Sequence, residues 1–339
     1  MMNNDHDIWH WQEPGSAWKG VGIYHVTLTV PSRKPLLGTL VIPNNDPKKA
    51  YVELCDLGMR VKTCVDEIPI RHPEVSIIQL RMMPDHVHVI LYVTRPMEVG
   101  IMTVVRGFWQ GAKRVGREST TSIGSNTIRD NKRCYPLFKE MPFVRPMSRR
   151  GQLQTMIRYV QMNPQRLATK RLMPELFWVQ DNIEIGGHTY KGVGCADLLQ
   201  RAQYMPVHVR RTMIDEASHG DDKRLRDYMN SCVIAARKGA VMVSPFISEQ
   251  EQAVMGVLLK EGHPFIYIAD NGFRDYYKPQ DALFDAVARK QVLILSPWEY
   301  DPKMRRVSRS RCIEMNNMAE EICTFSIDPE FNSGTNNKE

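Results

Sequence analysis

Short runs of alternating or wholly apolar residues in the first half of the chain predict strands, and longer segments with a helical period predict helices. The strand candidates are rich in β-branched residues and end at turn-forming residues. Strands are expected at Ile23–Val30, residues 38–43, Glu74–Leu80 and Val87–Val93, and helices at Asp46–Lys62, Val99–Val115 and Gln152–Met162. This mixture predicts an α+β domain, an antiparallel sheet with packed helices.

The pattern of predicted elements changes near Ala240, where strands that are apolar throughout alternate with helices. Strands are expected at Ala240–Val243, Pro264–Ala269 and Val292–Leu295, and helices at Glu249–Glu261, Ala282–Lys290 and Arg311–Cys323. Such alternation predicts parallel βαβ units and a small α/β Rossmann-like domain. The expected boundaries are a flexible tail (1–20), the first domain (21–180), a hairpin and linker (181–208), the Rossmann-like domain (209–325) and a disordered tail (326–339).

Composition narrows the class of protein. Hydrophobic residues make up 42% and charged residues 24% of the chain, as in ordinary globular proteins. No apolar run approaches the roughly 18 residues that span a bilayer, and the polar, acidic first residues do not have the pattern of a signal peptide. The 7 cysteines include no CxxC pair, which favours reduced thiols. We therefore expect a soluble, cytoplasmic protein with no membrane partner.

The distribution of charge points to a nucleic-acid partner. The net charge is only +7, but residues 101–175 hold 15 Lys and Arg against 4 acidic residues. Aromatic residues such as Phe143 and Tyr159 lie among these charges, a pattern suited to stacked single-stranded bases over a basic groove. A solvated basic face is the alternative. The candidate phosphate contacts are Arg106, Lys113, Arg114, Arg149, Arg150, Arg158 and Arg166.

Two histidines at the start of one strand form the first half of a candidate site. The two-residue period of a strand places His86, His88, Ile90 and Tyr92 on one face. Two imidazoles spaced in this way can chelate one divalent ion. A packed or surface histidine pair would give the same pattern.

Tyr159 and Asn163 form the second half. Residues four apart on a helix share a face, so the phenol and the carboxamide are expected to point the same way. The carboxamide oxygen is a ligand suited to Mg²⁺ or Mn²⁺. Alternatively, Tyr159 belongs to the core and Asn163 caps the end of its helix before Pro164.

The amino-acid sequences of these two segments resemble the motifs of a known family. The segments MPDHVHVILYV and RYVQMNPQR, in this order, are similar to the signature pair of the REP-associated tyrosine transposases in the HUH single-tyrosine superfamily. The stretch GIYHVTLTVPSRKPLLG resembles the family's first strand and the basic loop after it. The resemblance covers roughly residues 20–180. Asp85 replaces the usual Asn, and Gln161 stands where the family often has His.

The resemblance implies an HUH (ferredoxin-like) nuclease domain and a role for each site residue. His86, His88 and Asn163 would bind Mg²⁺ or Mn²⁺, and Tyr159 would be the nucleophile. Attack on single-stranded, hairpin-flanked DNA would give a 5′-phosphotyrosine intermediate and a free 3′-hydroxyl. The family also implies a homodimer acting in DNA transposition or in a domesticated derivative of it.

The C-terminal half contains the segments VMVSPFISEQEQAVMGVLLKEG, PFIYIADNGF and VLILSPWE, in this order. Together they resemble the Rossmann-like folds of DNA-processing or nucleotide-recognition proteins. The turn at Ser244 and Pro245 follows a strand, and ligands favour the carboxyl ends of parallel strands, so this turn could face a phosphate. No GxGxxG or Walker lysine loop is present. Two further hypotheses therefore remain, a non-catalytic DNA-binding regulator and a nucleotide-sensing protein that acts through residues 209–325.

Overall fold

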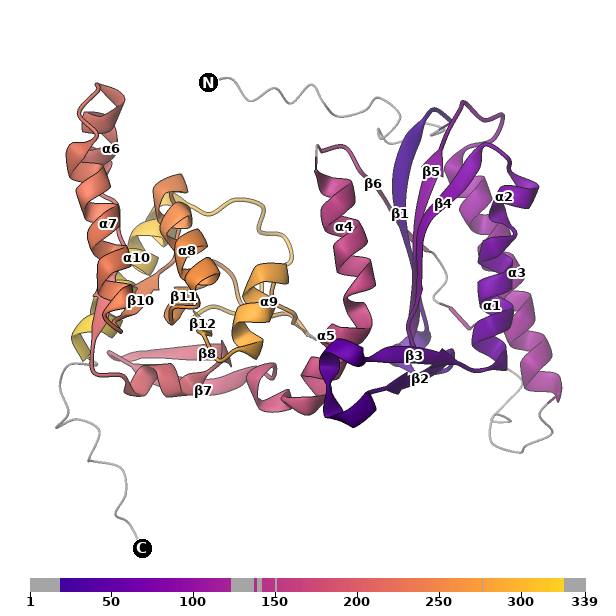
Figure 1. Cartoon of the computed structure of the whole chain (residues 1–339), viewed down its shortest axis with the longest axis horizontal. Helices are drawn as coiled ribbons and strands as arrows, with labels where there is room; N and C mark the ends of the chain where they lie inside the picture. Colours follow the sequence, from indigo (N-terminus) through magenta and orange to yellow (C-terminus); the bar gives the residue numbers. More distant parts are fainter. Residues whose placement is uncertain (1–18, 123–136, 139–141, 150, 276, 326–339) are drawn as a thin grey trace, which may run out of the picture. The chain divides into compact units, whose positions relative to one another are not determined.

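The computed structural model describes residues 19–122, 137–138, 142–149, 151–275 and 277–325. Arg150, the predicted tail at 326–339 and most of the predicted tail at 1–20 lie outside these residues. The chain forms two compact units, Met1–Leu172 and Met173–Glu339 (Figure 1). No helix in the described part is both long and apolar enough to cross a membrane.

The first unit is built on a four-stranded antiparallel sheet with the order β4-β5-β1-β6. Its other strands, β2 and β3, form a separate hairpin. The elements are β1 (Gly22–Thr29), β2 (Gly38–Val41), β3 (Tyr51–Leu54), α1 (Asp56–Asp66), α2 (Ile68–Arg71), β4 (Val75–Met82), β5 (His86–Val93), α3 (Ile101–Ser122), β6 (Phe143–Pro146), α4 (Gln152–Gln161) and α5 (Asn163–Leu172). The predicted antiparallel sheet with packed helices is therefore present.

Helices cover both faces of this sheet. Helices α1, α2 and α3 lie on one face and α4 on the other (Figure 1). Val87, Val89 and Leu91 of β5 are fully buried in the larger core on the α1 and α3 side. Ile90, which points to the opposite face, packs against Val160 of α4. The histidines share the face of Ile90, as the predicted alternation requires, and the structure shows that this face is covered by α4.

The prediction of one helix over Asp46–Lys62 is wrong, because the first part of that segment is strand β3. Side chains of β3 alternate between exposed and half-buried, and the strand pairs with β2 from Gly38 to Val41. Helix α1 begins only at Asp56. Gly58 allows the close approach of this helix to the preceding loop, because a Cβ there would lie 1.9 Å from the carbonyl oxygen of Leu37.

The second unit is a six-stranded sheet with the order β7-β8-β12-β11-β10-β9. Strands β9 to β12 are parallel, and β7 and β8 join them as an antiparallel hairpin. The elements are β7 (Gln180–Ile185), β8 (His188–Gly194), β9 (Tyr204–Pro206), α6 (Arg211–Ser218), α7 (Lys223–Arg237), β10 (Val241–Ser244), α8 (Glu249–Glu261), β11 (Phe265–Ile268), α9 (Asp281–Ala288), β12 (Val292–Ser296) and α10 (Arg309–Phe325). The predicted parallel strands are present, and the segment expected as hairpin and linker supplies three strands of the same sheet.

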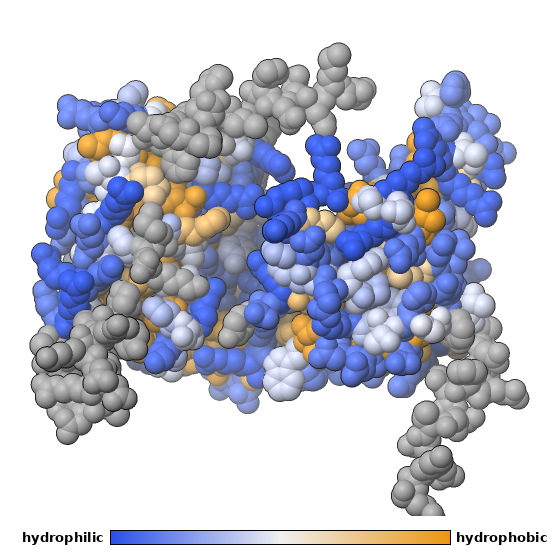
Figure 2. All heavy atoms as spheres, turned by 180° about the vertical axis from the view of Figure 1, so that it is seen from behind, coloured by the Kyte–Doolittle hydropathy of each residue, from blue (hydrophilic) through white to orange (hydrophobic). Residues whose placement is uncertain are grey.

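Complete burial explains the apolar strands of the second unit. All residues of β10 and β12 are buried, together with Phe265, Ile266 and Ile268 of β11. Parallel strands covered by helices have no solvent-facing side, so alternation with polar residues disappears. On the face of the molecule in Figure 2, hydrophilic side chains cover most of the described surface.

Candidate functional site

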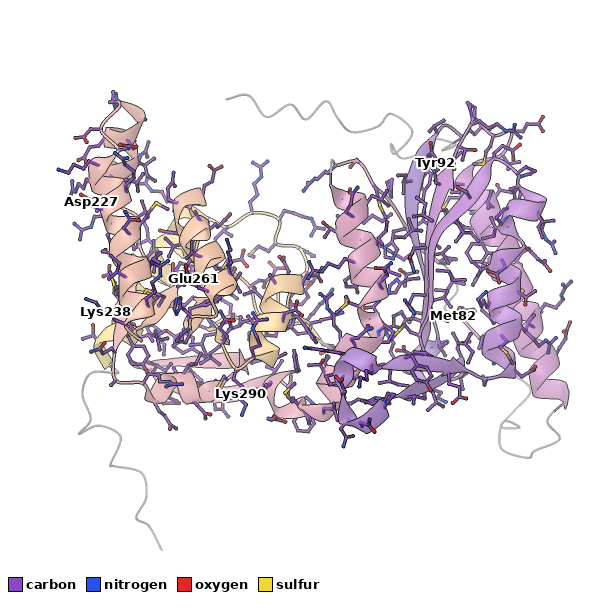
Figure 3. The ribbon with its side chains drawn as sticks, in the orientation of Figure 1. Met82, Tyr92, Asp227, Lys238, Glu261 and Lys290 are labelled. Atoms are coloured by element: carbon purple, nitrogen blue, oxygen red, sulfur yellow. The ribbon has the colours of Figure 1, made fainter. Side chains whose placement is uncertain are left out.

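His86 and His88 lie on the α4 face of the first sheet, at the end of β5 that pairs with Met82 of β4. Strand β1 runs antiparallel to β5, with Thr29 opposite His86 and Thr27 opposite His88. The two imidazole rings are edge-to-face, with centroids 4.7 Å apart. In Figure 3, Met82 marks this end of the sheet and Tyr92 the other end. The register therefore brings both histidines to one place.

His25 of β1 is a third histidine of the site, which the sequence reading did not single out. Its Nε2 lies 2.9 Å from Nδ1 of His88, and the hydroxyl of Thr27 lies 3.1 Å from the same nitrogen. Burial and the nearby charge of Arg145 lower the pKa of His25 to about 4, so this ring is neutral at neutral pH. Both neighbours hold the ring of His88 through Nδ1.

Asp85 holds His86 in the corresponding way. Nδ1 of His86 donates to the Asp85 carboxylate at 2.6 Å, and Arg33 lies 3.4 Å from the other carboxylate oxygen. Burial acts to raise the pKa of Asp85, but the hydrogen bond with His86 and the charges of His86 and Arg33 outweigh it and lower the pKa. Asp85, the residue that departs from the family pattern, is thus the carboxylate that orients His86.

Tyr159 approaches this cluster from α4. Its ring is edge-to-face with that of His88, with the centroids 5.8 Å apart. The side chain is half-buried and also packs against the apolar residues between α4 and the sheet. His88 and Tyr159, which are far apart in the chain, are therefore in contact.

Asn163 lies at a helix junction, and not on the same helix as Tyr159. Helix α4 ends at Gln161, Met162 has helical angles as its cap, and α5 begins at Asn163. The predicted helix Gln152–Met162 is therefore present, and a second helix that was not predicted follows it, with Pro164 in its first turn, where a proline loses no intrahelical hydrogen bond. Asn163 is 5% exposed. The carboxamide is thus buried where the two helices meet.

Arg166 is not a surface phosphate contact, contrary to the sequence-based expectation. The side chain is 3% exposed, and its guanidinium carbon lies 5.8 Å from the centroid of the Tyr159 ring. Burial follows from the continuation into α5, which turns this residue toward α4. Its place in the molecule is therefore beside the candidate nucleophile.

The other basic candidates divide between the two faces of the sheet. Arg106, Lys113 and Arg114 belong to α3, so the sheet separates them from Tyr159 and the expectation that they lie beside its helix is wrong. Lys113 lies over the ring of Trp109, 4.3 Å from its centroid. The remaining described candidates, Arg149 and Arg158, are exposed on the α4 side.

The described residues contain no group of three or more His, Cys, Asp and Glu side chains that could hold a metal ion. A metal site at His86 and His88 would therefore need a ligand of another type, and the carboxamide of Asn163 is the candidate that the sequence supplies. The chemistry of the donors fits, because each histidine is anchored through Nδ1 and would bind through Nε2.

In the second unit, the turn after β10 is bonded to the protein itself. The hydroxyl of Ser244 donates to the carbonyl of Val207 and accepts from the amide of Phe246. The carboxylate of Glu251, 3% exposed, accepts from three backbone amides at the start of α8 and in the neighbouring loop, those of Val209, Ile247 and Ser248. These are the donors that a phosphate would need, and at the turn that could face a phosphate they are bonded to the carboxylate of the chain itself.

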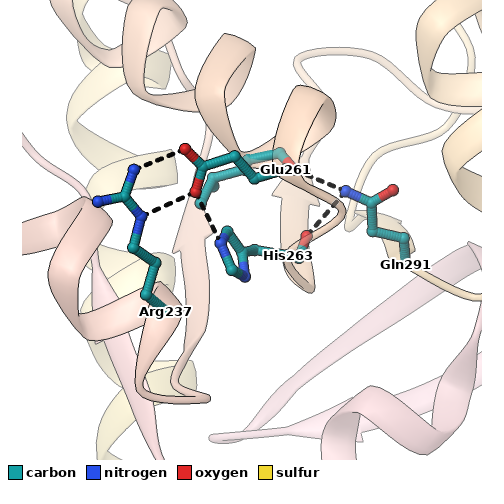
Figure 4. Close-up of polar contacts among 5 residues, drawn as sticks. Arg237, Glu261, His263 and Gln291 are labelled. Atoms are coloured by element: carbon teal, nitrogen blue, oxygen red, sulfur yellow. Dashed lines mark hydrogen bonds and ion pairs between the residues drawn. The ribbon is translucent and has the colours of Figure 1, made fainter.

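Polar contacts at the other end of α8 are structural (Figure 4). Glu261 accepts two hydrogen bonds from Arg237 and one from His263, and these lower its pKa to about 2. The amide of Gln291 donates to the carbonyls of Leu258 and His263. These bonds satisfy carbonyls at the helix end and join α7, α8 and β12.

Comparison with known proteins gave structural similarities only. No family model matches the chain, and no curated protein matches its sequence. One similar solved structure is a REP-associated tyrosine transposase bound to a REP hairpin, with 12% identity, a TM-score of 0.30, and 45% of this chain and 72% of that chain covered. Another is a candidate transposase from Deinococcus radiodurans R1, with 15% identity, a TM-score of 0.27, and coverages of 44% and 95%. Because both TM-scores are below 0.5, function is argued from the side chains of the site.

Proposed function

We propose that the chain is a transposase-like DNA endonuclease and strand transferase that cleaves single-stranded, hairpin-flanked DNA through Tyr159. The observation that carries this proposal is the contact between the Tyr159 ring and His88, one of two histidines whose Nδ1 atoms are held by neighbours. A phenol next to two anchored imidazoles is an arrangement for nucleophilic attack on a phosphodiester. A homodimer acting in transposition, or in a domesticated derivative, completes the proposal.

In the proposed reaction, the phenol oxygen of Tyr159 attacks phosphorus and the 3′ oxygen of the preceding nucleotide leaves. The new bond is a 5′-phosphotyrosine, and the leaving oxygen takes up a proton as a 3′-hydroxyl while the phenol gives its proton to solvent or a base. A 3′-hydroxyl of another strand can attack the phosphotyrosine in the reverse of this step, which releases Tyr159 and joins the two DNA strands without further energy. Arg166, 5.8 Å from the Tyr159 ring, favours the negative charge that develops on the phenol oxygen.

The residues around His86 and His88 hold the two imidazole rings in the orientation that metal binding requires. His86, His88 and Asn163 would hold Mg²⁺ or Mn²⁺, which when bound supplies Lewis-acid polarisation of the scissile phosphate. Asp85, whose carboxylate can only accept, fixes the tautomer and orientation of His86, and His25 with Thr27 holds the orientation of His88. Imidazoles with one nitrogen held in this way are pre-organised to present the other.

The test is a search for a covalent protein–DNA adduct. Purified protein is incubated with Mg²⁺ or Mn²⁺ and a labelled pool of single-stranded hairpins built from repeats that flank the gene. We expect a metal-dependent adduct that survives denaturing electrophoresis and is lost in Tyr159→Phe. Tyr92→Phe is the matched control, because Tyr92 points to the same face of β5 but lies at its other end.

Two outcomes would contradict the proposal. An adduct that persists in Tyr159→Phe would assign the nucleophile to another residue. Binding of the hairpins without any adduct, with either metal, would instead favour the hypothesis of a non-catalytic DNA-binding regulator.

A further inference from the structure

Phe143 is an exposed aromatic side chain in the same row of the sheet as His88. It belongs to the edge strand β6 and pairs with Thr27 of β1, which in turn pairs with His88 of β5. Directly opposite residues of antiparallel strands point to the same face. The Phe143 ring therefore lies on the α4 face, about 10 Å from His88 as judged from the spacing of two strands.

This ring is 60% exposed, although its neighbours along the strand are used for packing. Val144 packs into the core on the α1 and α3 side, and Met147 packs against α4. Among the residues of the first unit that the structure describes, none covers this phenylalanine, which lies next to the candidate active site. Flat aromatic surface of this kind is what unpaired bases stack on.

Two arginines follow the ring along the chain, Arg145 on the same face of β6 and Arg149 in the loop after it. Arg145 is two residues along β6, opposite His25, and Arg145 and Arg149 both line a pocket of about 380 Å³ with Pro146, Ser148 and Gln152. None of these five lining residues is acidic, and within the part of the chain that the structure describes neither guanidinium is paired with a carboxylate. The pocket therefore attracts anions.

The loop that carries Arg149 is held in place. The side-chain oxygen of Gln152 accepts from the backbone amides of Ser148 and Arg149, at 3.0 and 3.1 Å. This fixes the direction of the chain between β6 and α4 and thus the position of the pocket relative to β6. A pocket with two cations, further along the chain from an exposed ring, suits an unpaired strand, with a backbone phosphate in the pocket and a base on the ring.

We infer that Phe143, Arg145 and Arg149 form a subsite for one unpaired nucleotide of the DNA strand, next to the phosphate that Tyr159 attacks. The inference rests on the proposed function, which supplies single-stranded DNA as the occupant, and goes beyond it by naming where a neighbouring base is held. Stacking accepts every base, so this subsite selects for an unpaired strand rather than for a sequence. It would thereby exclude duplex DNA from the site.

The test uses fluorescence of 2-aminopurine, which is quenched when the base stacks. The probe replaces one base at a time in the single-stranded flank of the hairpin oligonucleotides described above. All proteins carry Tyr159→Phe, so that binding is measured without chemistry. We expect quenching at one position of the flank, which Phe143→Ala abolishes and Phe143→Trp restores.

Affinity gives a second readout. Phe143→Ala should weaken binding by about 5- to 150-fold, the range for one stacked base, and should have no effect when the quenched position is abasic. Arg145→Gln and Arg149→Gln should each make the slope of log affinity against log salt less steep by about 0.7. Ile70→Ala is the matched control, because Ile70 is 78% exposed on α2, on the other face of the sheet.

The outcomes separate this subsite from the proposed function. Covalent adduct formation by the wild type together with unchanged quenching and affinity in Phe143→Ala would overturn the subsite alone. Loss of quenching in Phe143→Ala without any adduct in the wild type would support the subsite and refute the chemistry. Absence of quenching at every position, or a change in the protein's oligomeric mass on Phe143→Ala, would overturn the subsite, the latter by making the ring a protein contact.

Discussion

Removal of the Glu251 carboxylate should destabilise the second unit without touching the candidate catalytic residues. Glu251 accepts from the amides of Val209 and Ile247 at 2.8 Å and of Ser248 at 3.0 Å, and its backbone amide donates to the Ser248 hydroxyl to close a capping box. The Val209 amide is buried, so leaving it without an acceptor costs about 1–3 kcal/mol. The other two amides are partly accessible to water and add about 0.5–1 kcal/mol each.

We therefore expect Glu251→Ala to reduce the local unfolding free energy by about 2–5 kcal/mol, and Glu251→Gln by about half as much, because one oxygen remains as an acceptor. Glu249→Ala is the matched control. Glu249 is exposed in the first turn of the same helix and accepts no such bonds, so only a few tenths of a kcal/mol should be lost.

Hydrogen exchange read by mass spectrometry is the appropriate assay, because a chain with two units need not unfold in one step. Peptides that contain Val209 and the start of α8 should exchange faster in Glu251→Ala, while peptides from β1 and β5 keep their protection. A loss of less than about 1 kcal/mol, or one equal to that of Glu249→Ala, would refute the assignment of Glu251 as the internal acceptor for these amides.

Local geometry also predicts the effects of four other substitutions. Gly272→Ala should destabilise the second unit by about 1–3 kcal/mol, because a Cβ there would lie 2.4 Å from three backbone atoms of the loop after β12. Gly256→Ala, with nothing within 4 Å, should instead stabilise α8 by up to about 1 kcal/mol, and thermal melts that rank these two variants the other way would contradict both. The pKa of Glu261 is lowered to about 2 from an ordinary value of 4.5, so the stability that its carboxylate contributes is present above pH 4.5 and is lost as the pH falls toward 2. Thermal melts from pH 6 to pH 2.5 should therefore show a smaller loss of stability in Glu261→Gln than in the wild type. Parallel curves of melting temperature against pH would show that the pKa of Glu261 is not lowered on folding. His25→Ala should weaken Mn²⁺ binding by about 10- to 100-fold, because the ring of His88 loses one of the two neighbours that hold it. An unchanged dissociation constant from calorimetry would show that His25 is not needed.

Much of the sheet that carries the histidines could be predicted from the sequence, because period-two alternation is local information. The strand at Val87–Val93 was expected almost as β5 has it, with His86 and His88 on the face opposite the valines. The predicted helix Glu249–Glu261 has the bounds of α8, since Ser248 and Glu251 form a recognisable capping box and Gly262 ends the helix.

Features that depend on pairing between distant segments could not be predicted. His25 becomes part of the site only through the register of β1 against β5, which no local pattern encodes. Strand β6 is four residues long and its partner lies more than a hundred positions away, so Phe143 gave no strand signal. Asn163 and Arg166 were misplaced because helix α5 was not predicted: Pro164 was interpreted only as the end of α4, although it also lies in the first turn of the next helix, where proline is well suited.

Strand β5 contributes to the core with one face and to the candidate site with the other. The position of the site histidines therefore depends on the same strand register as the packing of the core. A slip of one residue in its pairing would turn His86 and His88 into the core and Val87, Val89 and Leu91 toward α4. Such a molecule would bury imidazoles in place of aliphatic side chains and would not compete with the native state. A chain that has folded with this core has therefore also placed its histidines correctly. Insertion or deletion of a single residue in β5 is expected to abolish both the site and the stability of the fold.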